Sequence, residues 1–193
     1  MGRRLTFERH DALKEATELF WREGYINTSL KQLLKAMEMG ESSFYHSFGS
    51  KRSLYKECID YYNGTFMKAR IQALKGEASG KNPIYAFFDV VIEDLSGFKQ
   101  KGCLITNSLA SEVLEEQEMR DMLFRDFEGI RSVISKIIIE SIQKGEFRSD
   151  LDPLATARII FTYLHGLNRL SVVEFDAEKQ RGETQAFLDA LLK

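Results

Sequence analysis

Residues 28–51 read TSLKQLLKAMEMGESSFYHSFGSK, and this stretch decides how the first part of the chain folds. Apolar residues recur at helical spacing from Leu30 to Met37, which predicts a helix with one apolar face. Thr28 or Ser29 begins that helix, because either hydroxyl can accept the unpaired N–H groups of its first turn. The run Glu38–Gly40 breaks the pattern and predicts a turn.

A second, shorter helix is predicted from Glu41 to Ser47. Phe44 and Phe48 lie four residues apart, so both rings can face inward and anchor this helix. Its other side chains are mostly small and polar, and Ser50 can cap a third helix after it. A short helix held by apolar anchors, with small polar residues outside, suits insertion into the major groove of DNA.

Five polar residues of the second helix are candidates for facing that groove: Glu41, Ser42, Ser43, Tyr45 and His46. Serine hydroxyls can donate hydrogen bonds to phosphates or to base edges. An aromatic residue on a helix usually lies in the core, but Phe44 and Phe48 already supply the core contacts. We therefore expect Tyr45 to point outward.

This segment resembles the helix-turn-helix of the TetR family of bacterial transcriptional repressors. The resemblance covers roughly residues 8–60 and rests on Phe20, Gly24–Tyr25, Thr28–Ser29, Ser43–Phe44–Tyr45 and Phe48–Gly49–Ser50–Lys51. The pattern FY-x-x-FGSK at this distance from G-Y-x-x-T-S is specific, whereas helical pairs in general are not. The one departure is Glu38, because the family usually has glycine in the turn, where a positive φ is costly for glutamate.

The resemblance implies two sets of DNA contacts. Phosphate contacts are expected from Thr28, Tyr45, His46 and Lys51. Base-facing positions are expected at Lys31, Glu41 and Ser42. The expected partner is a double-stranded operator with two similar half-sites.

The whole chain of 193 residues suits an all-α fold of about nine helices. It is 44% hydrophobic, contains two prolines, and has no alternating strand-like run. We expect a three-helix DNA-binding domain over residues 1–50 and a larger ligand-binding and dimerisation domain over 51–193. The further helices are expected over Thr6–Glu23, from Ser50 toward Leu74, over Pro83–Leu95, from Cys103, from Glu118 to Gly145, after Asp152–Pro153, and from Ala177 or Glu183 to Leu192.

Charge is distributed unevenly although the formal net charge is only −2. Cations outnumber acids over residues 1–56, whereas residues 112–126 are strongly acidic. This asymmetry fits a DNA-binding end joined to an end that avoids DNA, and the alternative is that both are ordinary solvated helix faces.

Several classes of protein are disfavoured. Two cysteines give neither a disulfide framework nor a metal-binding spacing, and no cofactor is expected. There is no signal-peptide pattern and no apolar run near the ~20 residues of a membrane helix, so a cytoplasmic protein without a membrane partner is expected. The three histidines fall in different helices, and no catalytic motif is present, so an enzyme is not expected.

The resemblance implies that a small organic effector binds among the helices between Pro83 and Leu170. The candidate lining residues are aromatic or contain sulfur: Phe87, Cys103, Met122, Phe127, Phe161 and Tyr163. Each of the aromatic and methionine residues can instead be plain core. Cys103 follows a basic loop at the start of a helix, which favours a reactive sensing thiol, whereas the neighbouring Leu104 and Ile105 favour burial.

The last two helices are too apolar to be covered within so short a chain, so we expect each to pair with its copy in a homodimer. By resemblance, this is also where the family dimerises. The predicted interface residues are Ile160, Leu164, Leu167, Phe187, Leu188 and Leu191.

The sequence therefore predicts a ligand-responsive transcriptional regulator, a repressor that a small effector releases from DNA. One alternative is a helical enzyme or carrier whose helix-turn-helix is only a packing motif. Another is a DNA-binding protein with no effector.

Overall fold

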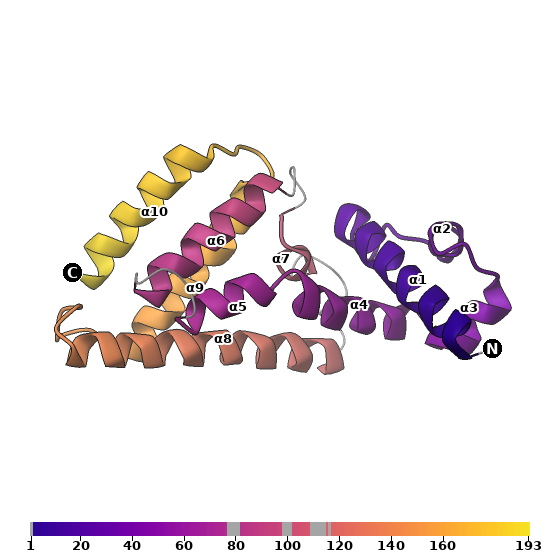
Figure 1. The fold of residues 1–193 in the computed structure, drawn as a ribbon, viewed down its shortest axis with the longest axis horizontal. Coiled ribbons are helices and arrows are strands. Elements are labelled where there is room, and N and C mark those ends of the chain that lie inside the picture. The colour runs from indigo at the N-terminus through magenta and orange to yellow at the C-terminus, as the bar shows by residue number, and fades with distance from the viewer. Residues whose placement is uncertain (1, 77–81, 98–101, 109–114, 116) are drawn as a thin grey trace. The chain divides into compact units, whose positions relative to one another are not determined.

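The computed structural model describes residues 2–76, 82–97, 102–108, 115 and 117–193, with residues 2–8 and Ser108 described by their backbone alone. Ten α-helices and no strand are present in these residues, so the predicted all-helical fold is confirmed (Figure 1). The helices are α1 (Gly2–Glu23), α2 (Leu30–Ala36), α3 (Glu41–Phe48), α4 (Lys51–Thr65), α5 (Lys68–Leu74), α6 (Pro83–Gly97), α7 (Leu104–Ser108), α8 (Gln117–Gln143), α9 (Pro153–Leu170) and α10 (Ala177–Leu192).

The count exceeds the predicted nine because the helix expected from Ser50 toward Leu74 is two helices. Helix α4 ends at Thr65, and α5 begins at Lys68. Two helix starts match the sequence closely. Ser50 caps α4 by accepting the N–H of Ser53, and Asp152 caps α9 ahead of Pro153 at its first position.

The chain folds into two compact units. The first comprises residues 1–67 and 103–120, and the second comprises residues 68–102 and 121–193. This division differs from the boundary predicted between residues 50 and 51, because α4 packs against α1. Helix α8 contributes its first turn to one unit and its remainder to the other.

The first unit has an aromatic core between α1 and α4. The ring of Phe20 lies 4.9 Å from that of Tyr55, and Trp21 lies 5.0 Å from Tyr62, both edge-on. Cys58 of α4 is fully buried, and burial raises the pKa of its thiol to about 12, so it is a core residue. Helix α7 packs on both α1 and α4. The acidic residue Glu118 pairs with Lys56 of α4, which lowers the pKa of Glu118.

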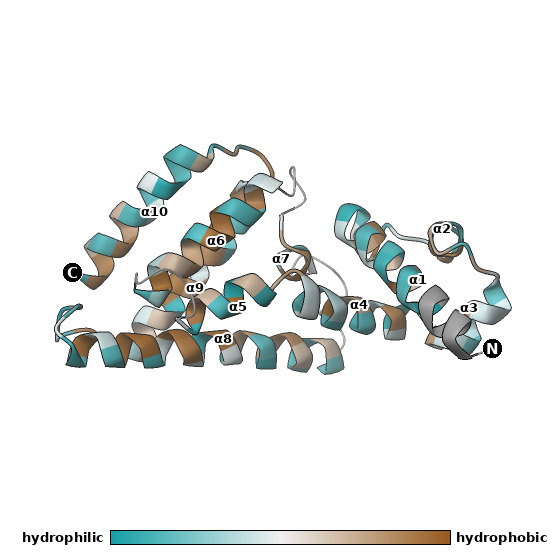
Figure 2. Cartoon of the chain, in the orientation of Figure 1, coloured by the Kyte–Doolittle hydropathy of each residue, from teal (hydrophilic) through white to brown (hydrophobic). Residues whose placement is uncertain are grey.

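The second unit buries one continuous apolar cluster contributed by α5, α6, α8, α9 and α10. Apolar and polar bands alternate along α8, so one face of this helix enters the core (Figure 2). Within the described part of the chain, none of the helices combines the length and the hydropathy needed to cross a bilayer.

A buried ion pair joins three helices of this unit. The Arg70 guanidinium on α5 is 2% exposed, and its Nε donates to Oδ2 of Asp94 on α6 over 2.6 Å. Its Nη1 also donates to Oδ1 of Asn168 on α9 over 3.5 Å. A guanidinium removed from water is tolerated only with such partners, so the pair fixes how α5, α6 and α9 meet.

Aromatic rings fill part of the contact between α8 and α9. The rings of Phe127 and Phe161 lie 5.1 Å apart, and the imidazole of His165 lies 4.4 Å from Phe161 and 5.2 Å from Phe127. Burial, with the nearby charge of Arg131, lowers the pKa of His165 to about 4, so this imidazole is neutral at pH 7.

Removing the carboxylate partner of Arg70 should be costly. We expect Asp94→Ala to lower the free energy of unfolding in urea by about 3 kcal/mol, because it leaves a buried charge unpaired. The neighbouring variant Glu93→Ala is the control. It breaks only the exposed pair with Arg181 and should cost less than about 1 kcal/mol. The double variant Arg70→Met/Asp94→Leu should recover most of the loss, and equal losses in the two single alanine variants would contradict this role.

The pKa of His165 predicts a loss of stability in acid. The imidazole binds a proton near its ordinary pKa of 6.5 in the unfolded chain, and only near 4 in the folded protein. The contribution of His165 is therefore complete above pH 6.5 and falls as the pH drops toward 4, by up to about 3 kcal/mol. Urea unfolding of His165→Gln across this range should show a shallower pH dependence than the native protein. The variant His10→Gln, which removes an exposed imidazole, is the control, and parallel curves for all three proteins would exclude the effect.

Candidate functional site

Helix α2 is held by a capping box at its start. The Ser29 hydroxyl accepts the Gln32 N–H over 3.3 Å, and the Gln32 side chain accepts the Ser29 N–H over 2.8 Å. Thr28, in contrast, is fully buried, and its hydroxyl donates to the carbonyl of Gly24 over 2.7 Å. The prediction that the Thr28 side chain contacts a phosphate is therefore wrong, because the hydroxyl is already bonded and out of reach. Lys31 on the same helix is exposed.

The turn between α2 and α3 contains a strained residue. Glu38 has a φ of 50° and is the only non-glycine residue with a positive φ in the described chain. This is the position at which the sequence departs from the expected glycine, and the left-handed conformation costs glutamate on the order of 1 kcal/mol. The turn nevertheless forms, with the N–H of Met39 donating to the carbonyl of Leu34 over 3.1 Å.

Helix α3 presents a polar outer face on an apolar base. Phe44 and Phe48 are 0% and 3% exposed, as expected for its anchors. Tyr45 is 49% exposed, so the expected outward orientation of this ring is confirmed. The other polar candidates on this helix are also exposed: Glu41, Ser42, Ser43 and His46.

Two cations near the C-terminal end of α3 lie over aromatic rings. The Lys51 ammonium lies 4.3 Å from the centre of the Tyr25 ring, and partial burial lowers its pKa. The guanidinium carbon of Arg9 on α1 lies 4.7 Å from the centre of the Phe48 ring. Arg9 also donates to the Ser47 carbonyl and to Glu57 of α4, so it ties α1 to the end of α3.

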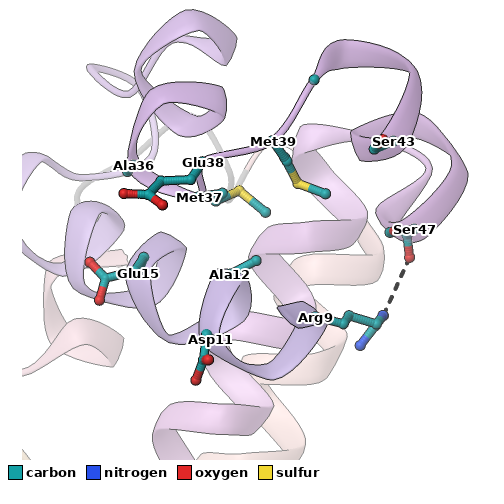
Figure 3. A pocket seen from close by; sticks show the side chains of 11 residues that line it. Arg9, Asp11, Ala12, Glu15, Ala36, Met37, Glu38, Met39, Ser43 and Ser47 are labelled. Carbon is teal, nitrogen blue, oxygen red and sulfur yellow. Dashed lines mark hydrogen bonds between the residues drawn. The ribbon is translucent and has the colours of Figure 1, made fainter. Parts of the chain in front are cut away.

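A hollow of about 840 Å³ lies beside the helix-turn-helix (Figure 3). Its walls come from α1, from the last residue of α2, from the interhelical turn and from α3. Its charged lining residues are three acids, Asp11, Glu15 and Glu38, and one cation, Arg9, so the excess of negative charge repels phosphate groups. Ser43 lines this hollow together with Ser47, whereas Ser42, Tyr45 and His46 do not. Ser43 is thus exposed as predicted but belongs to the acidic side of α3.

The residues predicted to bind a ligand do not form one group. Phe127 and Phe161 meet between α8 and α9, as described above. Tyr163 instead stacks on Phe187 at 4.1 Å and shares a hydrogen bond with Thr184. Phe87 is 1% exposed and contacts Phe88, which in turn contacts Tyr163. Met122 is half-buried on α8.

Cys103 belongs to the first unit, unlike the other five predicted ligand residues. Its side chain is 5% exposed, and its sulfur accepts the Tyr62 hydroxyl over 3.4 Å. The described structure places it just before α7, which begins at Leu104. A reactive thiol needs access to solvent, so this burial favours the core alternative over a sensing role. Lys99 and Lys101, the cations of the basic loop that precedes Cys103, lie outside the described residues.

Two polar residues beside Phe127 and Phe161, namely Arg131 and His165, were not predicted from the sequence as site residues. Arg131 follows Phe127 by four positions on α8, and His165 follows Phe161 by four on α9. The guanidinium carbon of Arg131 lies 5.4 Å from the centre of the Phe161 ring. The i,i+4 spacing was visible in the sequence, but only the packing of α8 on α9 brings the two pairs together.

Most of the predicted dimer residues lie in the core of the second unit. Ile160, Leu164, Leu167 and Leu188 are between 0% and 9% exposed within one chain. The prediction that these four form an interface is therefore wrong, because their own chain already covers them. Phe187 and Leu191 are half-buried against the same core.

Helix α9 has a second apolar set that its own chain leaves open. Ile159 is 47% exposed and Leu170 is 64% exposed. Leu154, in the first turn of α9, is 67% exposed. The buried apolar residues of α9 therefore stabilise the fold of the chain, and its exposed apolar residues are available to a partner.

Comparisons with known proteins match both parts of the chain. Residues 12–58 match the family described as bacterial regulatory proteins, tetR family, and residues 80–187 match the tetracyclin repressor-like C-terminal domain. The transcriptional repressor DhaR of Mycobacterium sp. (strain GP1) is 24% identical over 186 residues, which cover 96% of this chain and 90% of that protein. The repressor NemR of Escherichia coli (strain K12) is 23% identical, with 83% and 81% covered.

Solved structures agree with this match. A cysteine mutant of the TetR family transcriptional regulator CifR, in complex with 26-bp double-strand operator DNA, superimposes with a TM-score of 0.78 and 26% identity. The match covers 93% of this chain and 94% of that one. The reduced form of E. coli NemR has a TM-score of 0.79 at 20% identity, with 96% and 97% covered. Because family matches cover both the helix-turn-helix and more than half of the chain, this protein belongs to the TetR family of bacterial transcriptional regulators.

Proposed function

We propose that this protein is a homodimeric repressor that binds a two-half-site operator and releases it when a small organic effector binds. The proposal rests on the two faces of α3. Its polar side chains Ser42, Tyr45 and His46 are exposed, and its two phenylalanine rings are buried beneath them. A polar helix supported in this way can enter a major groove without losing its own packing. CifR, which is similar over most of its length, is described in complex with operator DNA.

The contacts divide by chemistry. Ser42 and Glu41, at the start of α3, are placed for base edges, together with Lys31 of α2. Tyr45, His46 and Lys51 are the phosphate contacts, and the Tyr25 ring restricts where the Lys51 ammonium can lie. These assignments place the DNA-reading residues within the first 51 positions, and we place effector binding and dimerisation in the second unit. The site of action is the cytoplasm.

We propose a dimer interface on the solvent side of α9 and α10. Ile159 and Leu170 supply the apolar surface of α9, and Gly166 between them is exposed and small. On α10 the exposed residues Gly182, Ala186 and Ala190 recur every four positions. A row of small residues lets two helices approach closely, and an identical patch on a second copy would cover all of it. This interface uses the same two helices as the predicted one. It replaces the predicted interface residues that lie in the core with residues that are exposed.

The first test is DNA binding. Tyr45→Ala and Lys51→Ala should each weaken binding to operator and to random duplex alike. For Lys51→Ala the slope of log affinity against log salt should fall by about one, because one phosphate contact is lost. Ser42→Ala should instead change the preference among sequences. Fluorescence anisotropy with the DNA upstream of the protein's own gene, across a salt series, measures all three.

The control for this test is Lys136→Ala, which removes an exposed lysine of α8 and should leave DNA binding unchanged. If Tyr45→Ala and Lys51→Ala both keep native operator affinity, the assignment of α3 fails. Weak, sequence-blind binding by the native protein would favour the alternative of a helical enzyme or carrier with a helix-turn-helix used only for packing.

The second test is the oligomeric state. Ile159→Glu should convert the dimer to a folded monomer and weaken operator binding by roughly a hundredfold or more, because the two half-sites are no longer held together. The matched control is Ile139→Glu on α8, because Ile139 is 43% exposed and Ile159 is 47% exposed. Leu164→Glu, in the core, should lower the melting temperature instead. Sedimentation velocity at micromolar concentration measures the mass, and a native monomer would refute the proposed dimer.

A further inference from the structure

The aromatic cluster between α8 and α9 surrounds a guanidinium. The guanidinium carbon of Arg131 lies 5.4 Å from the centre of the Phe161 ring and 5.9 Å from that of Phe124. The His165 ring stands edge-on to Phe161, and the Phe127 ring is tilted by 59° against it. Two helices thus supply three phenylalanine rings, an imidazole and one permanent positive charge within one small region.

Arg131 has an unused donor. Its Nη2 pairs with the Glu128 carboxylate one turn earlier on α8, and the Glu128 side chain is 49% exposed. Its Nε is buried and donates no hydrogen bond to any residue that the structure describes. A buried donor without an acceptor costs free energy, and an oxygen atom placed there recovers it. Arg70 provides the contrast in the same unit, because its Nε is bonded to Asp94.

The charge around this donor favours an acceptor that is itself negative. The Arg131 guanidinium brings one positive charge. His165, whose pKa is lowered to about 4, adds no second positive charge at pH 7. Glu128 offsets part of the guanidinium charge from its half-exposed position. The surroundings of Arg131 therefore suit a ligand group with a single negative charge. A doubly charged phosphate would bring a second negative charge, for which the described residues of this cluster provide no second cation.

We propose that the effector is an amphiphilic monocarboxylate whose carboxylate accepts a hydrogen bond from Arg131 Nε and whose hydrocarbon part packs on Phe127 and Phe161. The inference rests on the proposed function, because it names the chemical class that the effector-binding unit takes. The charge-assisted hydrogen bond fixes the acid end, and the rings provide apolar contact for the rest. A neutral amide of the same shape loses the charge term and binds at least tenfold more weakly.

The test uses the full-length protein without DNA. Benzoate and hexanoate are titrated by calorimetry against their neutral counterparts benzamide and hexanamide, with sodium chloride at matched ionic strength. We expect both carboxylates to bind and both amides to bind at least tenfold more weakly. In Arg131→Gln the carboxylates should lose about 10- to 100-fold in affinity. Arg125→Gln, an exposed arginine on the same helix, should bind as the native protein does.

A second measurement does not require the Arg131→Gln variant to fold. The Nε–H resonance of Arg131, identified in the nuclear magnetic resonance spectrum by its loss in Arg131→Lys, should move when benzoate is added to the native protein and stay in place with benzamide. Equal binding of acids and amides, an unmoved Arg131 resonance, unchanged affinity in Arg131→Gln, or no binding of either acid at concentrations on the order of 10 mM would each overturn the proposal.

Operator release is assayed separately from binding. Carboxylate binding that depends on Arg131 but leaves the operator complex intact supports the ligand class and contradicts the proposed effector response. Carboxylate binding that releases the operator in the native protein, but not in Arg131→Gln, supports both.

Discussion

A helix of eight residues is unstable in water by itself, and α3 is helical only because its surroundings keep it so. Phe44 and Phe48 supply that support from below, with both rings buried in the first unit. Arg9 adds a second restraint, since it covers the Phe48 ring and bonds the last turn of α3 and Glu57 of α4. The outward face of α3 is therefore free of any packing task and can be polar throughout.

Local rules were sufficient to predict the helix-turn-helix. Caps at Ser29 and Ser50, and the four-residue spacing of the two phenylalanines, depend only on neighbours in the sequence. The error at Thr28 shows the limit of such rules, because its hydroxyl can cap a helix, meet a phosphate or bond a carbonyl. Only the packed structure shows that it bonds Gly24.

The second unit was harder to predict, because its contacts join helices that are far apart in the sequence. Leu164 and Ile159 are equally apolar, and the sequence does not indicate which one the chain covers and which one it leaves exposed. The same holds for arginine. Arg70 and Arg131 look alike in the sequence, yet one is fully enclosed with an aspartate while the other keeps a donor open among rings. Pairing across helices, and not composition, gives the two side chains different roles.

The discontinuity of the first unit limits how this protein can recombine with others. Residues 103–120 return to complete the unit that residues 1–67 begin, and α7 packs on α1 and α4. A gene fusion cut after Met67 would therefore transfer an incomplete unit, with Tyr62 deprived of its partner Cys103. A fusion that transfers the DNA-binding unit to another ligand-binding domain must therefore include residues 103–120 as well. New specificities in this chain thus arise more readily by substitution than by exchange of segments.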